Sequence, residues 1–122
     1  MIIVDTSIWI DHLRNGDSVL ADLLENGRVL THPFVTGEIA LGSLRQRGAV
    51  LDALHSLPQA TVAGDDEVMM LIERDKLFSA GIGYIDAHLL TAVKLTPGAS
   101  IWTRDRRLRE ASTRLGLSAS LD

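Results

Sequence analysis

Two acidic residues stand at places in the chain where a carboxylate can take part in chemistry. Asp5 directly follows the apolar run at residues 1–4, and Asp105 lies just beyond the apolar run at residues 100–103. In open parallel α/β sheets, ligands collect beyond the carboxyl ends of the strands. Asp is also a favoured helix N-cap, and a helix is expected after each residue. Taken singly, each acid is therefore interpreted as a cap, and both roles can coexist on one residue.

Two further acids fall on helix faces that are otherwise apolar. On a helical wheel, Glu38 falls between Phe34 and Val35. The arc around it also includes Ile39 and Leu41 and is expected to face the core. Asp86 likewise falls inside the apolar arc of a later helix. An ionised carboxylate is almost never buried unpaired, because removing it from water costs several kcal/mol. A basic partner in the core would explain one such acid, but two of them together with two strand-end acids favour a functional reason.

Four converging carboxylates repel one another. Two like charges about 4 Å apart cost roughly 4 kcal/mol at an effective dielectric near 20, and the pKa of one carboxyl rises. A divalent cation removes this penalty. Oxygen ligands in a chain without cysteine point to a hard cation, Mg²⁺ or Mn²⁺, rather than to zinc. The chemistry that follows is hydrolysis of a phosphodiester, with one or two ions polarising the phosphoryl oxygen and activating water.

Length and composition limit the other classes of protein. The 122 residues suit a single domain, 1–122, and a 46% hydrophobic fraction allows a real core. A net charge of −4 argues against a sequence-independent coat for nucleic acid. The absence of cysteine excludes disulfides and a cysteine nucleophile, and it fits a reducing cytoplasm. No apolar run is long enough to cross a membrane, and the N-terminus lacks a signal-peptide pattern.

The apolar pattern predicts alternating strands and helices. Strands are expected at residues 1–4, 28–31, 60–63 and 100–103. Helices are expected at residues 7–14, 17–25, 33–44, 46–55, 65–78, 84–95 and 105–115. Short apolar strands separated by helices favour a small α/β fold: a doubly wound, three-layer α/β/α arrangement around a mostly parallel sheet.

The acids and their neighbours resemble the pattern of a known family. The chain shows Asp5-Thr6-Ser7 after the first strand and Glu38 on the third helix. Tyr84-Ile85-Asp86-Ala87 then opens a later helix, and Thr103-Arg104-Asp105 follows the last strand. This order resembles a PIN domain and covers residues 2 to about 108. The compact size and the start MIIVDTS are similar to the VapC toxins, the ribonuclease halves of VapBC toxin–antitoxin modules. Leu108, where Phe is frequent, is the one mild departure.

This resemblance implies an endoribonuclease that depends on Mg²⁺ or Mn²⁺ and cuts structured RNA such as tRNA or rRNA. Asp5, Glu38, Asp86 and Asp105 would form its catalytic and metal-binding cluster, with Asp5 and Asp86 as the surest ligands. Thr6, Ser7 and Thr103 would donate hydrogen bonds to the acids. Family members are commonly homodimers inhibited by a small antitoxin, so a VapB-like partner is expected.

Other readings and features stay open at this stage. A catalytically silent module of the same fold, which binds RNA or an antitoxin, would show the same sequence patterns and would differ only in lacking activity. A receiver-type signalling domain is also small and rich in strand-end acids. That class of domain needs a Lys where this chain has Arg104, and it would leave Glu38 and Asp86 unexplained.

Five arginines gather near Asp105, and we expect Arg104 and Arg106 to contact RNA phosphates. The five are Arg104, Arg106, Arg107, Arg109 and Arg114.

Overall fold

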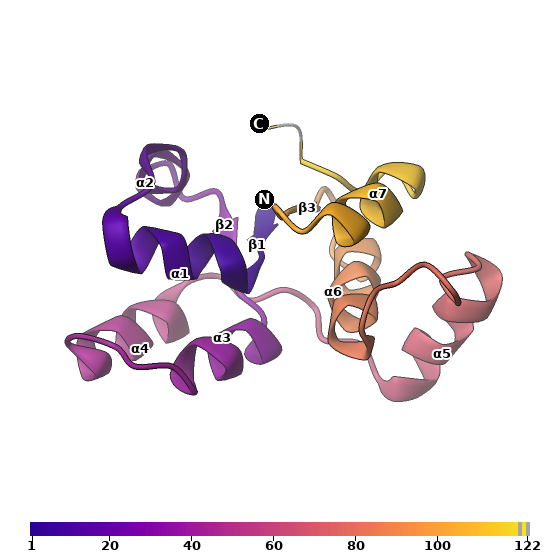
Figure 1. Cartoon of the computed structure of the whole chain (residues 1–122), viewed down its shortest axis with the longest axis horizontal. Helices are drawn as coiled ribbons and strands as arrows, with labels where there is room; N and C mark the ends of the chain where they lie inside the picture. Colours follow the sequence, from indigo (N-terminus) through magenta and orange to yellow (C-terminus); the bar gives the residue numbers. More distant parts are fainter. Residues whose placement is uncertain (120, 122) are drawn as a thin grey trace.

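A three-stranded parallel sheet runs through the middle of the molecule (Figure 1). The computed structural model describes residues 1–119 and 121. Strand β1 (Ile2–Val4) lies between β2 (Val29–Leu30) and β3 (Ser100–Trp102), and both neighbours run parallel to it. The chain leaves β1 for one neighbour and later returns to the other, so the carboxyl ends of β1 and β3 meet at a topological switch point. The expected doubly wound parallel arrangement is confirmed.

Short extended segments protect both edges of the sheet. Thr31 pairs with Gln59 beside β2, and Ile101 pairs with Ser118 beside β3. Exposed strand edges invite pairing with other chains, and these segments cover them. The strand expected at residues 60–63 is wrong, because the residue that bridges to the edge of the sheet is Gln59, just before this range. Ala60 donates its N–H to the Thr31 carbonyl, but the next N–H, that of Thr61, leaves the ladder for the Thr96 hydroxyl.

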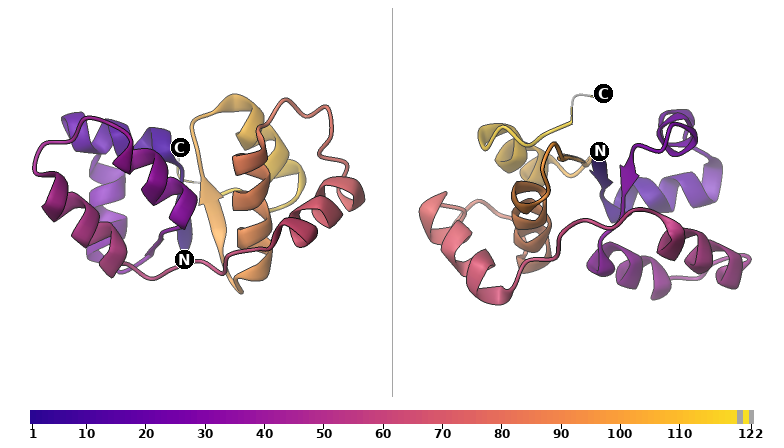
Figure 2. Two further views of the ribbon diagram at one scale, coloured as in Figure 1. Left: turned by 90° about the horizontal axis from the view of Figure 1, so that it is seen from below. Right: turned by 180° about the vertical axis from the view of Figure 1, so that it is seen from behind.

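Helices cover both sides of the sheet (Figures 1 and 2). Helices α1 to α4 lie on one side of β1 in Figure 1, and α5 to α7 lie on the other. Their bounds are α1 (Thr6–Asn15), α2 (Ser18–Glu25), α3 (Pro33–Ala40), α4 (Arg47–Ser56), α5 (Asp65–Arg74), α6 (Tyr84–Leu95) and α7 (Arg106–Arg114).

Two helices end earlier than their apolar patterns predict. Helix α3 ends at Ala40 rather than residue 44, and α5 ends at Arg74 rather than residue 78. After α3 the chain enters a turn at Leu41 and a bend at Gly42, whereas two residues after α5 the backbone turns left-handed, with φ of 54° at Lys76. L-residues do not continue a right-handed helix in this conformation. The apolar residues Leu41 and Phe78 therefore belong to turns and are exposed.

The core lies along the sheet and the central helix α6. All three residues of β1 are buried, and α6 buries seven consecutive residues from Ala87 to Val93. A strand covered on both faces reads as a continuous apolar run, which is the pattern that β1 shows. In residues 1–119 and 121, no helix combines the length and the apolar character that crossing a membrane requires.

His32 connects β2 to α3 from inside this core. Its Nδ1 accepts the Phe34 N–H at 3.1 Å and so caps α3, while its side chain has no solvent exposure. Burial lowers the pKa of His32 from 6.5 to about 4, and the charge of His88 acts in the same direction. The folded protein therefore holds this imidazole neutral at pH values where the unfolded chain would protonate it.

We expect His32 to make the fold sensitive to mild acid. Because its pKa is lower in the folded state, its stabilising contribution is complete above about pH 6.5 and is lost as the pH falls towards 4. Between pH 7 and pH 5 the wild-type protein should lose about 2 kcal/mol more unfolding free energy than a His32→Asn variant, whose amide can still cap α3. Urea unfolding at the two pH values measures the difference. Equal losses of unfolding free energy in both proteins would contradict a lowered pKa of His32 in the folded state.

Candidate active site

Asp5 is held at the carboxyl end of β1 by donors from the ends of two strands. Its backbone N–H donates to the Trp102 carbonyl of β3 at 2.9 Å. Its Oδ1 accepts the Thr6 N–H at 2.8 Å, and its Oδ2 accepts the Thr103 hydroxyl at 2.8 Å and the Ser7 hydroxyl at 3.3 Å. Asp5 also caps α1 and is only 9% exposed. Three donors thus fix the orientation of one carboxylate, and two of these residues, Thr6 and Thr103, also form hydrogen bonds with other acids.

Thr6 links Asp5 to Glu38 on α3. The Thr6 hydroxyl donates to Glu38 Oε1 at 3.1 Å, across the gap between α1 and α3. Glu38 is exposed, so the expectation that it faces the core is wrong. The wheel placed Phe34 and Leu41 in the core as well, but they are 36% and 89% exposed. The face of α3 that packs inward is made of Val35, Thr36 and Ile39.

Thr103 links Asp5 to Asp105 at the start of α7. The hydroxyl that donates to Asp5 also accepts the Asp105 N–H at 3.0 Å. Asp105 Oδ1 accepts the Leu108 N–H at 2.9 Å, and its carboxylate therefore caps α7. Leu108 is fully buried, so the leucine fills a core position. The interpretation of Asp5 and Asp105 as helix caps is confirmed, and the hydrogen bonds expected of Thr6, Ser7 and Thr103 are present.

Asp86 faces the other three acids from the first turn of α6. It is half-buried and accepts the Gly83 N–H at 3.3 Å. Burial raises the pKa of the Asp86 carboxyl, and the negative charges of Asp5, Asp105 and Glu38 raise it further, whereas the Gly83 hydrogen bond lowers it. All three acids therefore lie within electrostatic range of Asp86. The four residues that the sequence singled out thus lie in one region, with the other three close enough to Asp86 for their charges to affect it.

The four acids form an open cluster rather than a finished metal cage. Within residues 1–119 and 121, no three acidic or histidine side chains lie close enough together to hold an ion as they stand. The donor set nevertheless has the chemistry of a site for a hard cation, because every side chain facing Asp86 in it is a carboxylate. The mutual repulsion at Asp86 is the penalty that such a cation relieves. The residues present therefore fit Mg²⁺ or Mn²⁺ in ligand type.

Arg104 braces the loop that carries Thr103 and Asp105. Its two terminal nitrogens lie 3.1 Å from Asp11 on α1 and 2.7 Å from Asp17, the N-cap of α2. Its guanidinium carbon also stands 5.4 Å from the centre of the Trp102 ring. The hydrogen bond from Arg104 lowers the pKa of Asp17. In the sequence Asp17 stands only at the start of an expected helix, and its ion pair with Arg104 was not predicted, because this partner lies 87 residues away.

Arg106, the other arginine expected to contact RNA, is placed differently. Its side chain is 79% exposed and lies 3.8 Å from Glu110 on the same helix. Contact with RNA stays a prediction for both arginines. For Arg104, the two ion pairs give a structural role whether or not RNA is bound.

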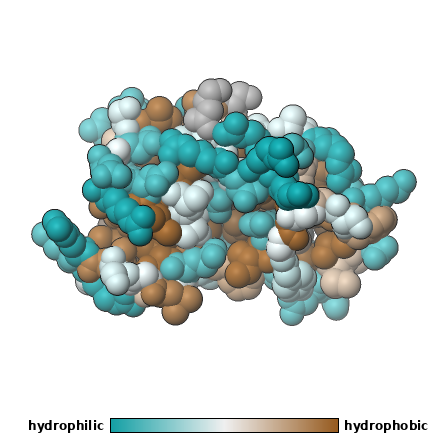
Figure 3. All heavy atoms as spheres, in the orientation of Figure 1, coloured by the Kyte–Doolittle hydropathy of each residue, from teal (hydrophilic) through white to brown (hydrophobic). Residues whose placement is uncertain are grey.

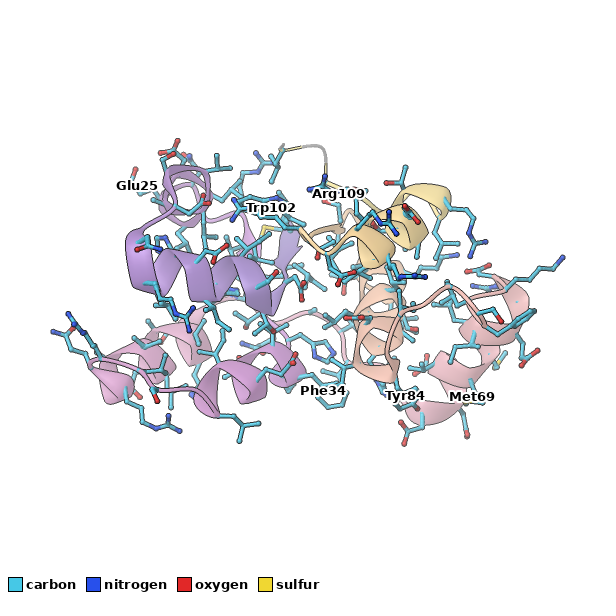
Figure 4. All side chains as sticks on the ribbon, in the orientation of Figure 1. Glu25, Phe34, Met69, Tyr84, Trp102 and Arg109 are labelled. Atoms are coloured by element: carbon cyan, nitrogen blue, oxygen red, sulfur yellow. The ribbon has the colours of Figure 1, made fainter. Side chains whose placement is uncertain are left out.

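Aromatic and histidine rings join α3 to α6 beside the acids. His88 is buried and packs edge-to-face against Phe34 of α3 and Tyr84 of α6, at ring distances of 4.8 and 4.7 Å. Figure 4 shows Phe34 and Tyr84 approaching from the two helices. His88 Nε2 and the Tyr84 hydroxyl both donate to Asp65 Oδ1, at 3.0 and 2.7 Å. These contacts fix the first turn of α6, which carries Asp86. The sequence did not predict these contacts, because Asp65 stands only at the start of an expected helix and His88 lies 23 residues away.

Comparison with known proteins identifies relatives along nearly the whole chain. Residues 2–113 match the family model of the PIN domain. A protein named Ribonuclease VapC32 is 48% identical over 118 residues, which are 97% of this chain and 95% of the relative. The similarity has the same extent for the proteins from two strains of Mycobacterium tuberculosis, CDC 1551 / Oshkosh and ATCC 25618 / H37Rv.

Removing the charge of Asp86 should stabilise the metal-free protein. Because the pKa of Asp86 is raised on folding, the ionised form destabilises the fold at neutral pH, and this cost disappears as the pH falls through the raised value. In Asp86→Asn the amide oxygen can still accept the Gly83 N–H. The side chain is half exposed and screened by solvent, so the gain should stay below about 1 kcal/mol, a rise of about 2–5 °C in Tm at pH 7 in EDTA.

Glu67→Gln is the matched control for this measurement. Glu67 accepts the N–H of Gly64 at the start of α5, just as Asp86 accepts that of Gly83. The Glu67→Gln variant should not be stabilised, because a carboxylate in the first turn of a helix is favourable when no like charges repel it. A Tm for Asp86→Asn that falls as far as that of Glu67→Gln would show that no repulsion acts at Asp86.

Arg104→Ala should lower the free energy of unfolding, because Asp11 and Asp17 lose their ion pairs with the guanidinium. Asp17 is only 13% exposed, and its carboxylate would lose the cation that offsets its burial. With solvent screening at the guanidinium taken into account, the loss should be about 1–2 kcal/mol, or roughly 4–10 °C in Tm. Arg104→Lys should recover only part of it, because one ammonium cannot bridge two carboxylates in a fixed fork. An unchanged Tm of Arg104→Ala would contradict a structural role for Arg104 and would favour contact with a ligand instead.

Proposed function

The chain belongs to the PIN-domain family, and from this premise we propose that it is a metal-dependent endoribonuclease, the toxin of a type II toxin–antitoxin module. The proposed reaction is hydrolysis of phosphodiester bonds in RNA, with tRNA or rRNA as the substrate class. The observation that carries the proposal is the electrostatic convergence of three carboxylates on Asp86, beyond the carboxyl ends of β1 and β3. Similarity to a relative named as a ribonuclease supports the choice of RNA as substrate.

In this proposal Asp5 and Asp86 hold Mg²⁺ or Mn²⁺, with Glu38 and Asp105 completing the site directly or through water. When bound, the cation would supply positive charge to the scissile phosphate and lower the pKa of an attacking water. Asp5 suits the central role, because its hydrogen bonds fix its orientation before any ligand arrives. Its two strongest fixing donors, Thr6 and Thr103, belong to the segments that follow β1 and β3.

Glu38 and Asp105 would orient the attacking water and accept its proton. Glu38 is tethered at Oε1 by Thr6, so the rest of its carboxylate can accept a hydrogen bond from a water and take up its proton as general base. Asp105 is anchored at Oδ1 by the Leu108 N–H, so the rest of its carboxylate can orient the same water. Asp86, with its raised pKa, would stay ionised most firmly when a cation neutralises the surrounding charge.

The partners in this proposal are those of a toxin. A VapB-like antitoxin would hold the enzyme inactive in the cytoplasm, and two copies of the chain would form a homodimer. Exposed apolar residues on and beside α5 and α6 offer a surface that a second copy could bury: Met69, Met70, Phe78, Tyr84 and Ile85. Figure 4 shows Met69 beside α5.

The decisive test is end-mapping of total cellular RNA incubated with the purified protein. In Mg²⁺ or Mn²⁺ we expect new, discrete RNA ends, which disappear in EDTA. Asp86→Asn should reduce cleavage by about a hundredfold or more, a loss typical of removing a key electrostatic group from an active site. Total RNA is the substrate because a selective nuclease could ignore a chosen oligonucleotide.

The variants make the outcome unambiguous. Asp86→Asn is the preferred inactive form, because we expect it to fold at least as stably as the wild type, so that lost cleavage cannot reflect unfolding. Glu67→Gln should cut like the wild type. Absence of new ends with every cation would instead favour a catalytically silent binding module of the same fold.

A further inference from the structure

A groove leads away from the acidic cluster along α1. It has a volume of about 640 Å³ and lies between α1, α3, the loop after α3 and the start of α4. Arg14, Glu38 and Arg45 contribute charge to its lining. The apolar part of the lining consists of Ile10, Leu13, Ile39, Leu44 and Val50. The surface view in Figure 3 shows hydrophobic and hydrophilic side chains side by side on this face of the molecule. The groove is therefore neither a purely apolar slot nor a purely charged surface.

The groove is continuous with the site through Glu38. This residue lines the groove and also accepts the Thr6 hydroxyl beside Asp5. Thr6, Ile10 and Leu13 recur at helical spacing on one face of α1, so the groove follows that face from the acids towards the end of the helix. Arg14 stands about 12 Å beyond Thr6 along the helix axis. It is too far along the helix to contact a scissile phosphate at the acidic cluster, but it is well placed for a phosphate further along the same strand.

The two arginines of the groove are available to a ligand. Both are exposed, and among residues 1–119 and 121 no carboxylate lies within 4.0 Å of either guanidinium. Arg104, closer to the acids, is by contrast engaged with Asp11 and Asp17. Exposed guanidinium groups in a groove that opens onto a carboxylate cluster are complementary to a polyanion, and they bind phosphate in a bidentate manner.

We propose that this groove holds the RNA strand on one side of the scissile bond, with Arg14 and Arg45 each neutralising a flanking phosphate. This inference rests on the proposed ribonuclease function and adds a binding subsite to it. No aromatic side chain lines the groove in the part of the chain that the structure describes, so it offers no platform for base stacking. Its contacts are to the phosphate backbone, with the sugars against Ile10 and Leu13. The subsite therefore positions RNA without reading its sequence.

Binding of total tRNA by the full-length Asp86→Asn protein in EDTA tests the subsite without cleavage. We add Arg14→Ala and Arg45→Ala, singly and together, and measure Kd between 50 and 200 mM salt. The double variant should bind about tenfold more weakly. The slope of log K against log salt should fall by about 1.4, because each single-strand phosphate that the protein no longer neutralises reduces it by about 0.7. Lysine at both positions should restore most of the slope, because it retains the charge.

Arg28→Ala is the matched control. Arg28 is also exposed, but it precedes β2 at the opposite end of the sheet from the acids, so its removal should leave the salt slope unchanged. In the active protein, the double groove variant should raise KM for RNA cleavage about tenfold and change kcat less than twofold, because the groove lies away from the reacting phosphate.

The outcomes separate this inference from the proposed function. If the wild type cleaves RNA but the double groove variant has the same Kd, salt slope and KM, the subsite is overturned and the nuclease stands. If the variants bind RNA normally but escape a co-expressed antitoxin, the groove serves a protein partner, and the subsite is again overturned. If the wild type neither cleaves nor binds any RNA, the proposed function fails, and the subsite falls with it.

Discussion

The hydrogen bond from Thr103 to Asp5 is the interaction on which the arrangement of the site depends. It joins residues 98 positions apart and connects the ends of two neighbouring parallel strands, β1 and β3. The same hydroxyl accepts the Asp105 N–H, while Thr6 carries the connection from Asp5 to Glu38. One line of hydrogen bonds thus runs through three of the four acids. A buried carboxylate needs such donors to be tolerated at all, and here the donors that stabilise Asp5 also set the positions of its neighbours.

Helix geometry makes the concentration of negative charge tolerable. Asp5 caps α1, Asp105 caps α7, and Asp86 lies in the first turn of α6. The amino end of a helix carries partial positive charge and free N–H donors, so three of the acids sit where a helix favours an anion. The compensation is incomplete, because burial and the neighbouring charges still raise the pKa of Asp86. Capping and ligand binding are therefore two uses of the same carboxylates, and the residual repulsion is what a cation would relieve.

Local signals in the sequence predicted much of this structure, and the failures have physical reasons. Asp5 and Asp105 were recognisable because a strand end and a helix cap are both local patterns. Glu38 was found on a mistaken premise: the apolar arc of its helix included Phe34 and Leu41, which the tertiary fold leaves at the surface. The strand expected at residues 60–63 failed because the Thr61 N–H bonds to the Thr96 side chain instead of the sheet. The brace of Arg104 on Asp11 and Asp17, and that of His88 on Asp65, join distant segments and leave no trace in local spacing.

The position of β3 near the end of the chain also has a consequence for biosynthesis. The central strand β1 finds its first partner at residue 29 but its second only at residue 100, and the fourth acid follows at residue 105. A nascent chain on the ribosome folds from its N-terminus, so it carries Asp5 and Glu38 long before Thr103 and Asp105 emerge. Until then Asp5 lacks one of its three donors, the Thr103 hydroxyl, and the set of acids is incomplete. The fold thus delays completion of the centre until residue 105 has been synthesised, which gives a growing chain an interval without a formed site.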